Sequence, residues 1–199
     1  MVKSKHIYLL RRRREGKTDY RKRKNILLSK SVFLLPRITS KNICVQISKA
    51  TFIGDEVIAS SHTRELYKLG WKGSGTSLPA AYLTGLIAGL KANKLDIKHA
   101  IVYTGLRQYK TGSRISATLK GVTDSGLDIH ADNKTFPSKE RIKGEHISKY
   151  AESLLNADKE MYLRRFSKMI KTGLKPEDYP KHFEEIKKKI IGKYGVDKK

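Results

Sequence analysis

Arginine and lysine are the residues in this chain whose type and spacing most clearly predict a chemistry. Residues 1–30 contain 12 basic and 2 acidic side chains, including four consecutive arginines at positions 11–14. A guanidinium group matches the geometry of a phosphate and stacks on bases, whereas a lysine supplies a point charge. Neutralising phosphates also releases condensed counterions, which is entropically favourable. The N-terminal segment is therefore predicted to be an arm that lies on RNA.

Three further segments place basic side chains beside aromatic, amide or hydroxyl groups, at residues 37–42, 67–76 and 107–114. Aromatic rings next to cations can stack on unpaired bases while the charges hold the backbone. A solvated basic surface is the alternative for each of these segments and for the lysines at 187–189, and is less favoured for the dense arm. The predicted RNA-binding residues are Arg11, Arg12, Arg13, Arg14, Lys17, Tyr20, Arg21, Lys22, Arg23 and Lys24 in the arm, Arg37, Lys41 and Asn42 in the turn, Lys68, Trp71 and Lys72 in the first loop, and Arg107, Gln108, Tyr109, Lys110, Ser113 and Arg114 in the second.

The sequence contains no recognised motif of catalytic residues. Gly70, Gly75 and Thr76 superficially resemble a phosphate-binding loop, but the lysine that should follow the second glycine is missing. The expected strand segments at residues 32–35 and 100–103 carry no carboxylates for a two-metal nuclease, and the six histidines lack metal-ligand spacing. We therefore expect no enzymatic activity, no metal and no cofactor.

The overall charge of the chain also points to a polyanionic partner. The 199 residues carry a formal net charge of +24, and 38% of them are hydrophobic, which suits one main domain with solvated extensions. An anionic membrane is the rival partner, but no apolar run approaches the roughly 20 residues that span a bilayer. Cys44 is the only cysteine, which excludes an intramolecular disulfide and suits the reducing cytoplasm. Residues 7–10 are too short an apolar run for a signal peptide.

The hydrophobic pattern of residues 31–61 predicts three strands joined by tight turns. Residues 32–35 form a continuous apolar run, and Ile43, Val45 and Ile47 alternate with polar neighbours. A third short strand is expected over residues 56–60. Pro36 is expected to end the first strand early. The predicted arrangement is therefore an antiparallel meander whose first strand is short.

Helices and one more strand are predicted to follow this meander. A helix over residues 76–94, capped by Ser77, carries the small residues Ala81, Gly85 and Gly89 at a spacing of four, which we expect to pack on the sheet. A strand over 99–103 and a helix over 112–125 come next, and 127–143 is expected to be irregular apart from a helical turn. Three helices are predicted in the tail, beginning near residues 147, 158 and 180.

These elements predict an α/β fold with a mixed sheet. An N-terminal antiparallel meander is joined by a βα-connected strand, with helices packed on the sheet. The predicted divisions are a basic RNA-binding arm (1–30), an α/β core domain (31–143) and a helical C-terminal extension (144–199). The arm lacks a sustained apolar period and is expected to order on its partner, with residues near 18–28 helical when bound.

Four motifs resemble those of the archaeal-type ribosomal protein L-eighteen family of the large subunit, whose eukaryotic counterpart is ribosomal protein L-five. They are GSGTSLPAAYLTGLIAGLK at 73–91, REGKTDY at 14–20, LKGVTDSG at 119–126 and RIKGEHI at 141–147. The similarity runs in order over about residues 5–155 and is weakest beyond about residue 157.

The resemblance implies a non-enzymatic constituent of the cytoplasmic large ribosomal subunit. Such a protein binds 5S rRNA and helps attach it to 23S rRNA in the central protuberance, beside other ribosomal proteins. It implies RNA contacts on the arm, on the turn with Arg37 and Lys41, and on the loop with Arg107, Tyr109 and Arg114. No membrane and no small-molecule substrate is expected. A nuclease, and a basic protein that binds DNA or membranes, are the rival interpretations.

Overall fold

A mixed five-stranded sheet forms the centre of the protein in a computed structural model, which describes residues 8–195. The outer ends of the predicted arm and tail, residues 1–7 and 196–199, lie outside this range. The strand order is β3-β2-β1-β4-β5; β1 to β3 are antiparallel, while β4 runs parallel to β1 and to β5. The strands are β1 (Phe33–Ile38), β2 (Ile43–Ala50), β3 (Asp55–His62), β4 (His99–Val102) and β5 (Asp128–Ile129). The predicted α/β class, with a meander and a βα-connected strand, is confirmed.

The first strand does not stop at Pro36, as the sequence had suggested. It continues to Ile38, and Pro36 lies opposite Val45 in the ladder with β2. On its other edge, β1 pairs with β4 only at Phe33 and Leu34. Pro36 therefore lies where that edge of β1 is free, and a missing backbone N–H is tolerated at such a position.

The segment at 127–143, which was expected to be irregular, contains the short strand β5. It pairs with β4 through Asp128 and Ile129, and Leu127 and Ile129 are buried beside it. Two residues are too few to produce a readable alternation, so sequence periodicity could not reveal this strand. The predicted helical turn is present as α6 (Lys139–Lys143), after a short 3-10 turn at Asn133–Thr135.

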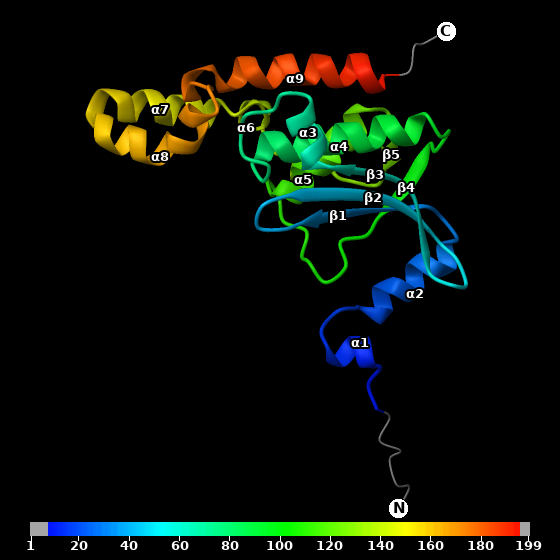
Figure 1. Ribbon diagram of the computed structural model, residues 1–199. Helices are drawn as coiled ribbons and strands as arrows, with labels where there is room; N and C mark the ends of the chain where they lie inside the picture. Colours follow the sequence, from blue (N-terminus) through cyan, green and yellow to red (C-terminus); the bar gives the residue numbers. More distant parts are fainter. Residues whose placement is uncertain (1–7, 196–199) are drawn as a thin grey trace, which may run out of the picture.

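Two helices cover one face of the sheet (Figure 1), α4 (Leu78–Asn93) and α5 (Arg114–Asp124). The predicted cap is present, because the Ser77 hydroxyl accepts the backbone N–H of Ala80 at 3.3 Å. The main apolar cluster lies between these helices and the strands, and includes Leu34, Ile47 and Leu119.

The two glycines of the small-residue stripe, Gly85 and Gly89, pack on α5, and the expectation that they pack on the sheet was wrong. A Cβ built on Gly85 would lie 2.1 Å from the carbonyl oxygen of Thr118, and one on Gly121 would lie 2.1 Å from that of Tyr82. The backbones of α4 and α5 therefore touch, which requires glycine on both helices.

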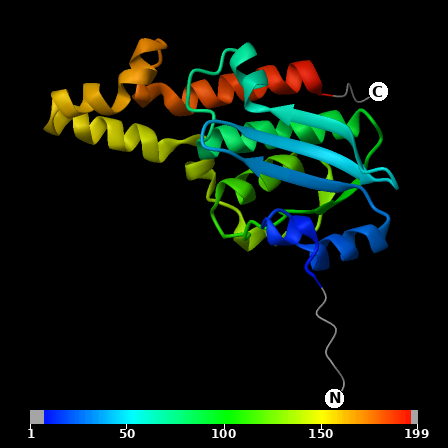
Figure 2. The ribbon, with the colours of Figure 1, turned by 60° about the horizontal axis from the view of Figure 1, so that its bottom comes forward.

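The tail forms three helices, as predicted: α7 (Glu145–Ala157), α8 (Lys159–Lys171) and α9 (Tyr179–Tyr194). Figure 1 shows α7 and α8 as a hairpin that projects from the body, and Figure 2 shows α9 lying along α4. Phe183, Ile186 and Ile190 of α9 are buried against Leu83 of α4 in a second apolar cluster. These three residues recur at helical spacing and form the inward face of α9. A short 3-10 turn at Pro176–Asp178 precedes α9.

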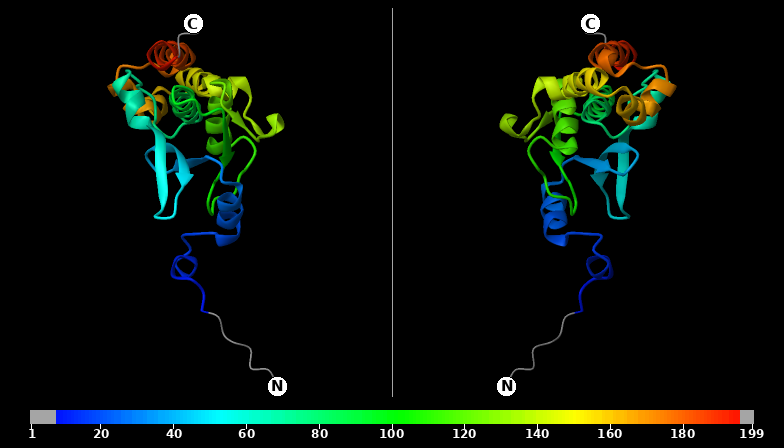
Figure 3. Two further views of the ribbon diagram at one scale, coloured as in Figure 1. Left: turned by 90° about the vertical axis from the view of Figure 1, so that its right-hand side faces the viewer. Right: turned by 90° about the vertical axis from the view of Figure 1, so that its left-hand side faces the viewer.

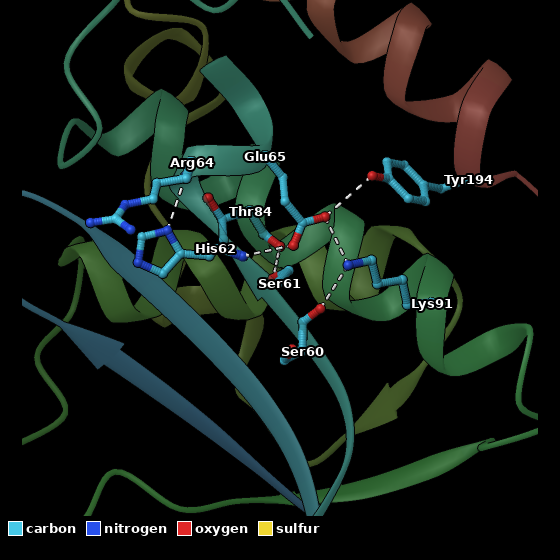
Figure 4. Close-up of polar contacts among 8 residues, drawn as sticks. All are labelled: Ser60, Ser61, His62, Arg64, Glu65, Thr84, Lys91 and Tyr194. Carbon is cyan, nitrogen blue, oxygen red and sulfur yellow. Dashed lines mark hydrogen bonds and ion pairs between the residues drawn. The ribbon is translucent and has the colours of Figure 1, made fainter. Parts of the chain in front are cut away.

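The C-terminal end of α9 is tied to the junction of β3 and α3 (Thr63–Lys68) by polar contacts (Figure 4). The Glu65 carboxylate accepts from Lys91 Nζ at 2.7 Å and from the Tyr194 hydroxyl at 3.2 Å. Its other oxygen accepts the backbone N–H of His62, and Lys91 also donates to the carbonyl of Ser60. One ion pair thus connects β3, α3, α4 and α9.

His182 attaches α9 to the loop at residues 67–76. Its ring stacks on Trp71 with centroids 5.2 Å apart, and its Nε2 accepts the backbone N–H of Lys72 at 3.1 Å. Burial lowers the pKa of His182; Glu185 opposes this shift, and the charges of Lys72 and Lys189 add to it. Because the folded-state pKa lies below the ordinary value of 6.5, the stability from neutral His182 is complete above that pH. It is lost as the pH falls through the lowered pKa.

We therefore expect the protein to lose more stability on acidification than a His182→Gln variant, which keeps a polar side chain but does not titrate. Urea unfolding between about pH 5 and pH 8 measures this difference. Parallel pH profiles for the two proteins would show that His182 does not carry the effect.

Candidate nucleic-acid interface

The predicted arm contains two helices, α1 (Arg11–Arg14) and α2 (Tyr20–Ser29). The second is capped by Asp19, whose carboxylate accepts the backbone N–H groups of Arg21 and Lys22 at 3.0 and 3.3 Å. Ile26 is the buried residue of α2, and it packs with Phe33 and Leu35 on the sheet face opposite α4 and α5. The helix expected near residues 18–28 is thus present and docked on the sheet.

Two basic side chains hold α2 in place. Arg23 forms an ion pair with Asp55 at the start of β3, and its guanidinium lies 5.4 Å from the centroid of the Phe33 ring. Lys22 Nζ donates to the carbonyl of Gly105 in the loop after β4 at 3.4 Å. The arm therefore contacts β1, β3 and the start of the loop after β4 at once.

A groove of about 790 Å³ lies between the arm, the end of β1, the start of β3 and the loop after β4. Figure 3 shows α2, the hairpin between β2 and β3 and the loop after β4 projecting on the same side of the molecule. Of the predicted residues, those that line the groove are Arg12, Lys17, Tyr20, Arg23, Arg37 and Arg107. Arg37 is the exposed residue of β1. Segments separated by up to 95 positions in the sequence are therefore brought together here.

Two smaller hollows adjoin the groove and share lining residues with it. One, of about 380 Å³, shares Arg107 with the groove and is lined by Gln108, Lys110, Ser113 and Arg114 among others. The other, of about 350 Å³, shares Tyr20 with the groove and includes Arg13 and Arg21. The arm, Arg37 and the loop at 107–114 thus form one continuous basic surface, called the basic groove below.

The remaining predicted arm and loop residues lie beside the basic groove. Arg11, Arg14, Lys22 and Lys24 are exposed on α1 and α2. Glu15, which follows α1, accepts hydrogen bonds from Arg11 and Lys17. These bonds, that of Arg11 most, lower the pKa of the Glu15 carboxyl, so its negative charge is already paired. Tyr109 is hydrogen-bonded through its hydroxyl to Thr135 at 2.5 Å.

The loop at residues 67–76 is not part of this surface. Trp71 is 3% exposed, packs edge-on against Tyr179 and stacks on His182, so its ring has no face open to a base. Lys72 Nζ donates to the carbonyl of Gly173 at 3.3 Å, which turns it toward the tail. The expectation that Trp71 stacks on RNA therefore does not fit its position, because α9 covers it. Lys68 is exposed on this far side.

The glycines of this loop have a packing role. A Cβ on Gly73 would lie 2.7 Å from ring atoms of Trp71 and from the Tyr179 hydroxyl, and one on Gly75 would lie 2.6 Å from the Tyr67 hydroxyl. Asn42 likewise serves the fold, since its Oδ1 accepts the Thr63 hydroxyl at 3.1 Å. Lys41, next to it, is exposed.

Some residues of the basic groove were not anticipated from the sequence. Thr18, Thr39 and Tyr103 line it, and Asp55 does so as the partner of Arg23. Tyr103 packs edge-on against Phe33, and burial raises the pKa of its hydroxyl. Tyr103 directly follows β4, and this position could have identified it from the sequence, because residues at the carboxyl end of a parallel strand often reach a binding site.

Other kinds of site were searched for in the part of the chain that the structure describes. Residues 8–195 contain no group of three or more His, Cys, Asp or Glu side chains arranged to hold a metal ion. Among the helices of the same residues, none is long and apolar enough to cross a bilayer. Burial raises the pKa of the Cys44 thiol, which disfavours the nucleophilic thiolate.

Comparisons with known proteins agree with the family resemblance of the motifs. The family model described as "Ribosomal large subunit proteins 60S L5, and 50S L18" matches residues 4–101. The protein named "Large ribosomal subunit protein uL18" of Ignicoccus hospitalis is 48% identical over 188 residues, which cover 94% of this chain and 92% of the relative. Those of the same name from Methanococcus maripaludis and Thermofilum pendens are 46% and 45% identical, and each alignment covers 91% of this chain and 93% or 92% of the relative. The chain therefore belongs to this family of large-subunit ribosomal proteins.

Proposed function

We propose that the protein binds 5S rRNA through the basic groove and helps attach it to 23S rRNA in the central protuberance of the large subunit. The family is one of structural ribosomal proteins, not enzymes, and works in the cytoplasmic large subunit. The observation that carries the proposal is the convergence of the arm, Arg37 and the loop at 107–114 on one surface.

The charge of the basic groove favours a polyanion over a protein surface. Arg12, Lys17, Arg23, Arg37 and Arg107 line the main groove. Among residues 8–195, the only carboxylate in its lining is that of Asp55, which is paired with Arg23. Five cations against one anion leave a surplus of four positive charges around one hollow. Such a surplus is stabilised by phosphates, with release of their counterions.

The apolar part of the groove favours structured RNA over a plain duplex. Leu35, Ile38, Tyr20 and Tyr103 line the same groove as the cations. Unpaired bases can stack on such rings, whereas a regular duplex offers only its grooves and backbone. The proposed ligand is therefore an RNA with accessible loops or bulges, as a folded 5S rRNA provides.

The other side of the molecule is proposed for 23S rRNA and neighbouring ribosomal proteins. There the α7–α8 hairpin projects away from the groove (Figure 1), with Arg164, Arg165 and Lys168 exposed on α8. In this proposal the arm (1–30) and core (31–143) hold 5S rRNA, while the extension (144–199) faces the rest of the subunit. Because α9 shares an apolar cluster with α4, the extension is rigidly joined to the core.

A competition experiment tests the proposed function. Labelled 5S rRNA bound to the protein is challenged with unlabelled 5S rRNA, duplex DNA or anionic vesicles at equal phosphate concentration. We expect displacement by 5S rRNA and little by the other two. Equal displacement by DNA or vesicles would indicate a general polyanion binder, and shortening of the RNA in magnesium would indicate a nuclease.

Replacing Arg107 and Arg114 together by alanine is expected to weaken 5S rRNA binding by about 10- to 100-fold, because two charge-assisted contacts are lost. Both side chains are exposed, so the unfolding temperature should not change. Lys68→Ala with Lys188→Ala removes the same charge from the far side and serves as the control. Equal affinities for the two double variants would mean that the loop at 107–114 is only solvated.

A further inference from the structure

The hairpin between β2 and β3 carries two apolar side chains that the fold does not use. Phe52 and Ile53 are fully exposed, and neither belongs to an apolar cluster within residues 8–195. Turns are usually built from Gly, Pro, Asn, Asp and Ser, each for a backbone reason that does not apply to these two. Bulky apolar groups held together in solvent typically mark a contact surface.

The turn that presents them is closed by hydrogen bonds. The backbone N–H and the hydroxyl of Thr51 both donate to the carbonyl of Gly54, at 2.7 and 2.8 Å. Phe52 and Ile53 therefore occupy the two central positions of a tight turn. The backbone that carries these two side chains is therefore already ordered before a partner covers them.

The position of the hairpin indicates what that partner is. Gly54 and Asp55 line the basic groove, and the ion pair of Asp55 with Arg23 joins the hairpin to the arm. Figure 3 shows the hairpin projecting on the same side of the sheet as α2 and the loop after β4. A ligand bound in the basic groove therefore lies beside the hairpin that carries Phe52 and Ile53.

We propose that Phe52 stacks on an unpaired base of the RNA that occupies the basic groove. A nucleotide combines an anionic phosphate with a flat π face, which matches cations and an exposed ring at the rim of one hollow. An apolar protein surface would cover the ring but would leave the neighbouring arginines opposite an uncharged partner. The inference rests on the proposed function and adds a base contact to it.

Substitutions at Phe52 test for stacking. With the full chain and 5S rRNA, Phe52→Ala and Phe52→Leu are both expected to weaken binding by about tenfold, and Phe52→Tyr is expected to bind as the wild type does. The slope of log affinity against log salt should stay the same, because no charge is removed. Leu163→Ala, at an exposed position on the projecting α8, serves as the control and should not change binding.

Each result has a defined meaning. Unchanged affinity of Phe52→Ala would overturn the proposal, and so would a Phe52→Leu variant that binds as well as wild type, because leucine preserves apolar contact but not stacking. Phe52→Trp adds a direct readout, since its emission should be quenched when RNA is added, beyond any change in the wild type with Trp71 alone. If the wild type itself fails to prefer 5S rRNA over duplex DNA, the proposed function fails, whatever the Phe52 variants do.

Discussion

Removal of residues 1–17 is expected to lower the affinity for 5S rRNA by about 100-fold at about 0.1 M salt. The deletion takes away seven basic side chains, namely Lys3, Lys5, Arg11, Arg12, Arg13, Arg14 and Lys17, and one acidic side chain, that of Glu15. If most of the basic groups neutralise a phosphate, the slope of log affinity against log salt should become shallower by about 3 to 5. Binding measured at a series of salt concentrations gives both quantities.

The structure decides where this truncation should end. Cutting after residue 17 leaves the Asp19 cap, the Arg23–Asp55 ion pair and the buried Ile26 intact. Removing residues 1–24, as charge alone would suggest, also deletes the cap and the ion pair and so mixes RNA contacts with docking of α2. Thermal unfolding of the shorter truncation should match that of the full chain.

A full-length variant with glutamine at positions 11–14 is the matched control for this experiment. It removes four charges but keeps the chain length, so its slope should change by about half as much as that of the truncation. A slope that does not change in either protein would mean that the arm does not contact phosphates, and the proposed role of the arm would be wrong.

Gly85→Ala and Gly121→Ala are each expected to destabilise the protein by about 3 kcal/mol or more, at the upper end of the range for overpacked cores. Each added methyl would lie 2.1 Å from a backbone carbonyl oxygen of the facing helix, which no rotamer change can relieve. Helices α4 and α5 must then move apart and lose contacts along their length. Urea unfolding measures the difference in the free energy of unfolding.

Gly192→Ala is the control, because this helical glycine of α9 has no neighbouring atom within 4 Å of its added methyl. Alanine there should stabilise the protein by about 0.5–1 kcal/mol, since it restricts the unfolded chain and favours the helix. The double variant Gly85→Ala/Gly121→Ala should cost less than the sum of the single changes, because both open the same contact. Wild-type stability for either single variant would contradict the close approach of α4 and α5.

The elements that the sequence predicted well are those with a local cause. The alternation of Ile43, Val45 and Ile47 predicted β2, and Ser77 and Asp158 were correctly placed at helix starts, where both accept backbone N–H groups. Each of these signals depends on neighbours within a few positions, so a single sequence contains it in full.

The expectations that failed depended on partners far along the chain. Pro36 was tolerated because β4, more than 60 positions later, leaves that part of β1 unpaired. Gly85 faces α5 rather than the sheet, and Trp71 lies under α9, whose stacking residue His182 is 111 positions away. No local pattern records which distant element covers a residue.

The sequence by itself determined the charge, the local elements and the family of this protein, because composition, periodicity and motifs are properties of the chain before it folds. Only the tertiary structure decided which basic residues share a surface. It brought the arm, Arg37 and Arg107 to one groove because α2 docks on the open face of the sheet through Ile26 and Arg23. It also placed Trp71 in the core and Phe52 in solvent, since the exposure of a ring depends on what packs over it and not on the residues beside it in the sequence.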